Sequence, residues 1–387
     1  MSVSVPKDKL FVGFIRTENS VALPPPTPAT GAGAWVRANL FSSVSNTILT
    51  LISVALIYLL LSQLLPFAVF DATFTGQDRT ACLASATRPE PGACWSFIST
   101  FINYFIYGSY PVELRWRVNL VYVLFFMSMI WVLWVNAPKR TWGAVAFFIV
   151  LPIISYVLLL GAPSIGLEKV TTERLGGMVV TFIVAIVGIV VSLPLGVLLA
   201  LGRRSNLPII KVFCVVFIEF VRGVPLITVL FAANFMLPLF LPPDWNPDRL
   251  LRALVAVVLF SAAYMAEVVR AGLQALPKGQ YEGANAMGLS YWQSMRLIIL
   301  PQALKATLPN IVNSNVALFK DTTLVSTVGI FDFVNTLQAS FKNPDWATPV
   351  TSTTGWLFAA AFYFICCYSM STYARTIETR LAIADKR

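Results

Sequence analysis

The sequence predicts an all-α polytopic membrane protein with about eight transmembrane helices. Of its 387 residues, 57% are hydrophobic and only 12% are charged, which is about half the charged fraction of a soluble domain. Long segments such as residues 38–70 carry no charge, and about 20 apolar residues suffice to cross a bilayer. The net charge of +10 comes from basic residues scattered between these segments, a pattern typical of membrane proteins rather than of nucleic-acid-binding proteins.

The first 38 residues are polar and are predicted to form a mostly disordered tail in the cytoplasm. They contain Pro24-Pro25-Pro26 and lack the apolar segment of a signal peptide. Trp35 and Arg37 stand at the end of this tail, where we expect the membrane surface. The uncharged segment that follows places the first transmembrane helix near Ser45–Pro66.

Residues 67–117 are predicted to be a large periplasmic loop, because charges, prolines and glycines return to the sequence there. Cys82 and Cys94 both lie in this loop, and an oxidising compartment would favour a disulfide that stabilises by roughly 2–4 kcal/mol. Two free thiols are the alternative. The stretch from Trp95 to Tyr107 is apolar and aromatic, so we expect it to lie on the membrane surface.

Seven further apolar segments are predicted to cross the membrane. Two of them complete a group of three helices within residues 39–163, and five lie within residues 174–378, followed by a short tail at 379–387. Basic residues are more numerous on the side of both termini, which places that side in the cytoplasm. The segments are residues 118–135, 142–160, 176–201, 209–240, 250–269, 304–331 and 355–373.

A polar loop, residues 270–304, separates the segments 250–269 and 304–331 and has a helical pattern of its own. Residues 280–287 are mostly small and favour a short helix, and Gly288 suits the left-handed conformation at a helix end. Ser290 is a good N-cap for a second helix, which Pro301 ends or follows. The loop is therefore predicted to form a helix, a sharp turn and a second helix at the membrane surface.

The spacing of residues in this loop resembles the EAA loop of bacterial ABC importer permeases. That motif reads Glu-Ala-Ala, three residues, Gly, nine residues and Ile-x-Leu-Pro; every spacing is kept here, with Gly283 in place of an Ala. In that family the loop is the coupling helix, which docks in a groove of a separate ATPase subunit. An ordinary amphipathic surface loop is the alternative. The ATPase-coupling residues that the resemblance implies are Glu282, Gly283, Ala284, Gly288, Ile298, Leu300 and Pro301.

Two further motifs are similar to sequences of polar amino-acid permeases of the histidine/glutamine type. Residues 219–226 match E-x-x-R-G-T-P-L with Val224 in place of Thr, and residues 320–324 match K-D-T/S-S/T-L. The resemblance covers about residues 175–380 and implies a type I importer core of five helices with the MetI-like fold. The three additional helices and the large outer loop resemble the long permeases of general L-amino-acid importers.

Polar side chains inside the predicted helices are the candidates for the substrate pathway, because an unpaired charge at membrane depth costs several kcal/mol. An amino acid carries a carboxylate and an ammonium group, and this set offers partners for both. One hypothesis pairs charges between the segments 209–240 and 304–331 around a polar cavity. Structural ion pairs, gating and, for the asparagines, helix packing are the alternatives, and Glu267 is interpreted as an interface charge. The candidates are Glu219, Arg222, Asn310, Asn313, Asn315, Lys320 and Asp321.

The residues that the chain lacks exclude several kinds of chemistry. It has no histidine, which rules out histidine-dependent metal and catalytic sites, and no Gly-Lys pair of a phosphate-binding P-loop. We therefore expect no catalytic residue, no metal site and no cofactor bound by this chain.

The resemblance implies partners that supply what the chain lacks. ATP and Mg would be bound by two copies of a partner ATPase subunit. A second permease subunit would complete the pathway, either a different, related chain or, as the alternative, a second copy of this chain. A periplasmic amino-acid-binding protein would deliver the substrate. We expect a multi-pass protein of the bacterial inner membrane, in contact with lipid and not with nucleic acid. A secondary transporter driven by an ion gradient is the alternative.

Overall fold

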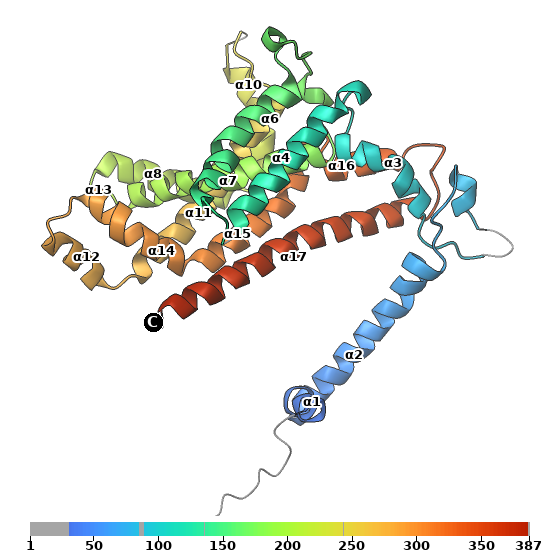
Figure 1. Cartoon of the computed structure of the whole chain (residues 1–387), viewed down its shortest axis with the longest axis horizontal. Coiled ribbons are helices and arrows are strands. Elements are labelled where there is room, and N and C mark those ends of the chain that lie inside the picture. The colour runs from blue at the N-terminus through green and yellow to red at the C-terminus, as the bar shows by residue number, and fades with distance from the viewer. Residues whose placement is uncertain (1–30, 85–88, 135, 243, 386–387) are drawn as a thin grey trace, which may run out of the picture. The chain divides into compact units, whose positions relative to one another are not determined.

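The computed structural model describes residues 31–84, 89–134, 136–242 and 244–385 (Figure 1). Within these ranges the structure is helical, and β-structure is limited to two isolated bridges. Six helices are long and apolar enough to cross a membrane, or seven if one sharply bent pair counts as a single span. The predicted all-α membrane fold is confirmed, whereas the predicted count of about eight spans is not.

The residues up to Pro66 form a unit of their own. Its described part contains α1 (Ala32–Leu40) and α2 (Val44–Leu65). Of these, α2 agrees with the first predicted span. The Ser43 hydroxyl caps α2 by accepting a hydrogen bond from the Asn46 backbone N–H (3.2 Å). The predicted disordered tail is wrong for its last residues, which form α1 because alanine and arginine favour a helix. Residues 1–30 lie outside the described residues.

The remaining spans belong to the second unit, which starts at Phe67. The first span of this unit contains α4 (Arg115–Leu133). The second consists of α5 (Arg140–Val145) and α6 (Leu151–Leu160), which one π-helical turn joins. The second predicted tail, residues 379–387, is helical up to Asp385, where α17 (Thr351–Asp385) ends.

The centre of this unit is the pair α7 (Met178–Arg203) and α11 (Arg249–Ala275), which pack along each other. A Cβ added at Gly196 of α7 would lie 2.7 Å from the Met265 Cβ of α11. The missing side chain therefore permits the close helix approach that is common in membrane proteins. α7 agrees with the predicted span 176–201. α11 agrees with the predicted span 250–269 and continues beyond its carboxyl end to Ala275.

The predicted span 209–240 is wrong as a single helix. It consists of α8 (Pro208–Gly223), α9 (Leu226–Phe231), one π-helical turn and α10 (Leu237–Phe240), with a bend of 107° between α8 and the rest. The cause is Pro225, which has no N–H to donate and disfavours a helical conformation at the residue before it. Val224 is accordingly extended (φ −113°, ψ 138°).

The predicted span 304–331 is also divided. α14 (Leu300–Ala306) ends at Thr307, α15 (Leu308–Asp321) follows, and a 3-10 helix, η9 (Thr322–Val328), leads to Gly329 with φ 77°. The second position of α15 is Pro309, which suits a helix start. With 14 residues α15 is too short to cross a membrane by itself. The apolar pattern of the sequence therefore joined elements that the backbone keeps apart.

A compact subdomain lies at the end of the spans opposite α12 (Figure 1). It combines η2 (Arg79–Cys82) and α3 (Trp95–Tyr107) with α16 (Phe333–Ser340) and the start of α17. Phe97 and Phe105 of α3 are fully buried and pack against rings of these later elements. α3 therefore packs on α16 and α17, which offer it apolar partners that are distant in sequence.

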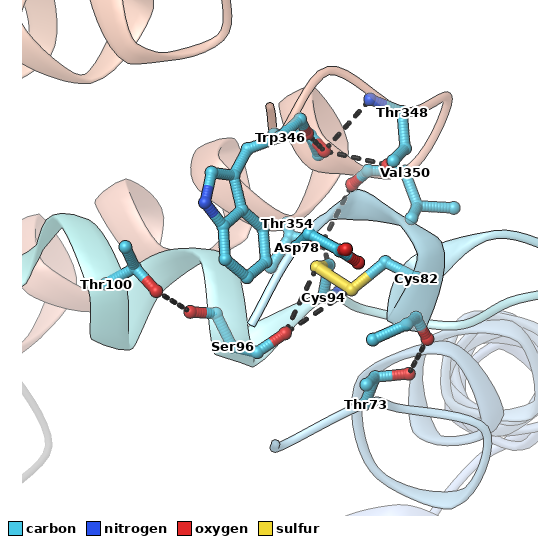
Figure 2. Close-up of a disulfide and its surroundings, with 12 residues drawn as sticks. Thr73, Asp78, Cys82, Cys94, Ser96, Thr100, Trp346, Thr348, Val350 and Thr354 are labelled. Atoms are coloured by element: carbon cyan, nitrogen blue, oxygen red, sulfur yellow. Dashed lines mark hydrogen bonds between the residues drawn. A yellow bond between two sulfur atoms is a disulfide. The ribbon is translucent and has the colours of Figure 1, made fainter. Parts of the chain in front are cut away.

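Cys82 and Cys94 form a disulfide in this subdomain, and both residues are buried (Figure 2). The Ser96 hydroxyl lies 3.4 Å from the Cys82 sulfur, and the Cys94 backbone N–H donates to the Thr354 hydroxyl (2.9 Å). The Arg79 backbone N–H donates to the Asp345 carbonyl (3.0 Å). The bridged loop is thus bound to the start of α17 and to the segment before it.

We predict that replacing both Cys82 and Cys94 with Ser lowers the free energy of unfolding by about 3 kcal/mol. Without the bridge, the unfolded chain gains the conformational freedom that the closed loop had removed. The midpoint of thermal unfolding in detergent measures this loss. The matched control replaces Cys366 and Cys367, which are free, and should leave the midpoint unchanged. Equal midpoints for the two double variants would contradict the prediction.

Asp332 is a fully buried carboxylate at the start of α16. It caps this helix by accepting hydrogen bonds from the backbone N–H groups of Asn335 (2.9 Å) and Val334 (3.2 Å). Burial nevertheless raises the pKa of the Asp332 carboxyl to about 7, because the charged form loses its hydration. The pKa in the folded state lies above the ordinary value of 3.8, so stability falls as the pH rises between these two values.

We predict that Asp332→Asn is more stable than the wild type above about pH 7, by at most about 4 kcal/mol. Asparagine caps helices as well as aspartate does but does not ionise. The advantage should shrink as the pH falls towards about 3, below the ordinary pKa of 3.8, where the wild-type carboxyl is mostly protonated in both states. Thermal unfolding midpoints of both proteins across this pH range test the prediction, which a pH-independent difference would contradict.

Candidate functional site

The loop between α11 and α14 folds as predicted. α12 (Lys278–Ala286) is followed by Gly288 in the left-handed conformation (φ 71°), then by α13 (Tyr291–Ser294) and a π-helical turn. The Leu289 backbone N–H closes the end of α12 by donating to the Ala284 carbonyl (3.3 Å). Ser290 and Gln293 form a capping box at the start of α13. The result is two short helices that meet at a sharp turn.

The motif residues of this α12–α13 loop (residues 276–301) fall into two groups. Ala284 is buried, and Ile298 and Leu300 are half-buried against the apolar cluster that α7 and α11 share. These residues attach the loop to the spans. The residues on the other side, which are exposed, are Glu282, Gly283, Gly288 and Pro301.

The exposed side of the loop also carries large apolar side chains. Met287 is 78% exposed and Trp292 is 65% exposed, and Tyr291 stacks edge-on against Trp292. A Cβ added at Gly283 or Gly288 would meet nothing within 4 Å, so no packing within this chain explains the small residues. Small residues beside exposed aromatic rings suit a surface on which another protein docks closely.

A network of ion pairs lies near this loop, where α7 ends. Arg203, the last residue of α7, binds Glu219 of α8 (2.7 Å) and Glu267 of α11 (2.8 Å). Glu267 also binds Arg270 (2.7 Å) and Arg222 of α8 (3.6 Å). Glu219 and Arg222 therefore lie at the end of the spans rather than at mid-membrane.

The hypothesis that pairs charges between the segments 209–240 and 304–331 is wrong, because the partners of Glu219 and Arg222 lie on α7 and α11. Interpreting Glu267 as a simple interface charge also missed its role, since it is the carboxylate that three arginines share. The spacing of Glu267 and Arg270, three residues apart on one helix face, was a signal for that pair. Arg203 carried no comparable signal.

The other candidates lie on α15, which is at membrane depth. Leu318 of α15 faces Gly188 of α7, near the middle of that span, and α15 packs against both α11 and α17. Asn310, Asn313 and Lys320 are exposed and follow the three-to-four-residue spacing of one helix face. Asn315, on a different face, and Asp321 are half-buried.

The exposed polar face of α15 needs cover that this chain does not supply. Among the described residues, the side chains of Asn310, Asn313 and Lys320 form no hydrogen bond or ion pair within the chain. A charged or amide group that faces hydrocarbon costs several kcal/mol. This face must therefore border water or another protein. The ion-pair network and the polar face are two separate groups, so the predicted set of pathway residues is not one site.

Metal binding has no support in the described part of the chain, where no group of three or more Cys, Asp or Glu side chains is suitably placed. The described residues offer an exposed loop with small and aromatic side chains, a junction of ion pairs and a polar helix face.

Comparisons with known proteins agree over most of the chain. The family model described as "Binding-protein-dependent transport system inner membrane component" matches residues 192–383. The chain is 46% identical over 360 residues to the inner membrane amino-acid ABC transporter permease protein YhdY of Escherichia coli strain K12, covering 92% of this chain and 96% of that protein.

Two further comparisons show a long and a short relative. The chain is 37% identical over 426 residues to the glutamate/glutamine/aspartate/asparagine transport system permease protein BztC of Rhodobacter capsulatus, covering 95% and 98% of the two chains. The glutamate/aspartate import permease protein GltK of Escherichia coli O157:H7 is 35% identical and covers 54% of this chain. Among solved structures, the crystal structure of an amino acid ABC transporter with histidines is 27% identical, covers 53% of this chain and 92% of that one, and has a TM-score of 0.47.

Proposed function

The chain belongs to the family of binding-protein-dependent transport system inner membrane components, and we propose that it is the permease subunit of an ATP-driven amino-acid importer. The observation that carries the proposal is the α12–α13 loop, whose motif residues fold into two helices with a small-residue surface exposed for docking. Relatives that match almost the whole chain and are named as amino-acid permeases support the choice of substrate. A secondary transporter driven by an ion gradient would not need this loop.

ATP hydrolysis belongs to a separate subunit, and this chain is not an enzyme. We propose that two copies of an ATPase bind ATP and Mg, and that one copy docks on the exposed side of the loop through Glu282, Gly283 and Gly288. This chain then supplies the transport pathway and the α12–α13 loop that receives the motion of the ATPase. The nucleotide chemistry takes place in the partner.

The pathway is proposed to run along the exposed face of α15. Asn310, Asn313 and Lys320 would border a water-filled passage between this chain and a second permease subunit, with Asp321 at its edge. The Lys320 ammonium suits the substrate carboxylate, and amide groups suit either end of an amino acid. A periplasmic binding protein would deliver the substrate to the end that carries the disulfide.

The domain organisation is likewise a proposal. Residues 174–378 would form the permease core and residues 39–163 would hold three additional helices, with both termini in the cytoplasm of a bacterium. The shorter relative, which spans about half of this chain, supports a core that is complete without the additional helices. The exposed apolar face of α8, with Ile209, Phe213 and Phe220, suits lipid or the second permease.

Reconstitution in proteoliposomes tests this function. The chain is purified with its ATPase, its permease partner and its binding protein, and uptake of radiolabelled amino acids is measured. Uptake should require ATP inside the vesicles and every one of the partners. Uptake by this chain alone, driven by an imposed proton or sodium gradient, would refute the importer and favour a secondary transporter.

A further inference from the structure

The ion-pair network described above has one centre. It contains four ion pairs, and three of the four involve Glu267, whose side chain is 15% exposed. The three arginines that Glu267 binds come from the end of α7, the end of α8 and α11 itself. The consecutive helices α7 and α8 are thus joined to α11 at one carboxylate.

The residue next to this network continues the connection to α12. Arg204 follows Arg203 at the end of α7 and donates a hydrogen bond to the hydroxyl of Tyr281 on α12 (3.0 Å). The same hydroxyl donates to the carbonyl of Leu273 in α11 (2.8 Å), and the Arg204 guanidinium lies over the Tyr281 ring, 5.4 Å from its centre. One tyrosine of the proposed coupling helix is therefore bound to both α7 and α11.

On its other side the network reaches the break between α8 and α9. Arg222 is the residue before Gly223, and besides pairing with Glu267 it lies over the ring of Tyr264 on α11 (5.7 Å). Beyond it, Val224 and Pro225 are extended, which separates α8 from α9, and the Pro225 carbonyl accepts the first backbone hydrogen bonds of α9. A Cβ added at Gly223 would meet nothing within 4 Å, so the chain has room to move there.

We propose that Tyr281, Arg204, Arg203 and Glu267 fasten the coupling helix α12 to the ends of α7, α8 and α11, so that a push on α12 turns these elements as one body about the break at residues 223–225. The proposal rests on the importer function proposed above. It assigns positioning roles to four residues outside the motifs and identifies the break as the hinge that receives the motion.

The physical reason is the cost of separating the charges. A largely buried carboxylate that loses its arginine partners is left poorly solvated, and breaking such a pair is strongly unfavourable. The network therefore resists relative motion of the three helices. Residues 223–225 carry no charged side chain, and Pro225 has no N–H with which to continue the helical hydrogen bonds of α8. When α12 is pushed, the ion pairs therefore oppose movement of the joined helix ends relative to one another, and the backbone rotates at residues 223–225 instead.

The test uses the complete importer in proteoliposomes and measures two quantities, the rate of ATP hydrolysis and the number of amino acids imported per ATP. Tyr281→Phe keeps the ring and removes the hydroxyl, and Glu267→Gln keeps the shape and removes the charge. The matched controls are Tyr368→Phe on the exposed face of α17 and Glu113→Gln in the exposed outer segment.

Each of the two test variants should still assemble with the ATPase and hydrolyse ATP, but should import about tenfold fewer amino acids per ATP, since each loses hydrogen bonds to a charged network. Combining them should lower this ratio little further than Glu267→Gln alone, because both act in one connection. Glu267→Asp should recover part of the ratio, and the two controls should match the wild type.

Two outcomes would overturn the proposal while leaving the function intact: ratios equal to that of the wild type in both variants, or losses that multiply in the combined variant. A variant that merely unfolds would fail to co-purify with the ATPase, and in that case Glu267→Asp with Tyr281→Phe repeats the comparison in a folded protein. If the wild-type vesicles themselves import nothing in response to ATP, the proposed function fails rather than this inference.

Discussion

Lys320→Met should reduce the rate of amino-acid uptake by about tenfold to a hundredfold in the reconstituted importer. Methionine has a similar length but no charge, so the change removes the ammonium group that we propose receives the substrate carboxylate. A hydrogen bond between charged partners contributes an amount that corresponds to this range. Uptake should be measured over a range of substrate-loaded binding protein, so that an effect on affinity is distinguished from an effect on the maximal rate.

The control for this variant is Lys342→Met, which removes an exposed lysine from the segment between α16 and α17. It should leave uptake unchanged, because Lys342 lies off the α15 face. Lys320→Arg should keep most of the activity. Uptake by Lys320→Met at the wild-type rate would remove Lys320 from the pathway.

A related pair of variants separates substrate contact from gating. Asn313→Ala and Asp321→Ala should weaken apparent affinity if these side chains contact the substrate. Unchanged affinity together with a loss of ATP hydrolysis in response to the binding protein would instead assign them to the gate.

Gly288→Val should abolish ATP-driven uptake by preventing the ATPase from docking. Gly288 has φ 71°, a conformation that costs a non-glycine residue of the L series about 1–2 kcal/mol and a β-branched one more. The space around it is open, so any effect arises from the backbone and not from a clash. The turn between α12 and α13 should open, and the two helices should lose the angle at which they present the docking surface.

Gly279→Ala is the matched control in the same loop. Gly279 lies inside α12, outside the proposed docking residues, with ordinary backbone angles and with nothing within 4 Å of an added Cβ. Alanine should be tolerated and should favour the helix by up to about 1 kcal/mol. Co-purification of the ATPase with each variant measures docking directly, and full ATPase recovery with Gly288→Val would show that the turn is not required.

The sequence was sufficient where a short-range pattern determines the structure. The capped helices of the α12–α13 loop, the left-handed Gly288 and the spans α2, α7 and α11 each follow from residues that are neighbours in the chain. It was insufficient at Pro225 and Thr307, where apolar composition continues across a break in the backbone. Hydropathy averages over such a break, whereas the missing N–H of a proline acts at one residue.

The sequence alone determined that this chain crosses a membrane repeatedly, lacks the residues for nucleotide chemistry and forms a loop of two short helices, because composition and local spacing decide these properties. Only the tertiary structure decided which charges meet. Arg203 and Glu267 are distant in sequence and come together because α7 and α11 pack along their lengths, and the rings of α3 are buried because α16 and α17 offer them apolar partners. Contacts of this kind depend on how helices pack in space, and no pattern within one segment records them.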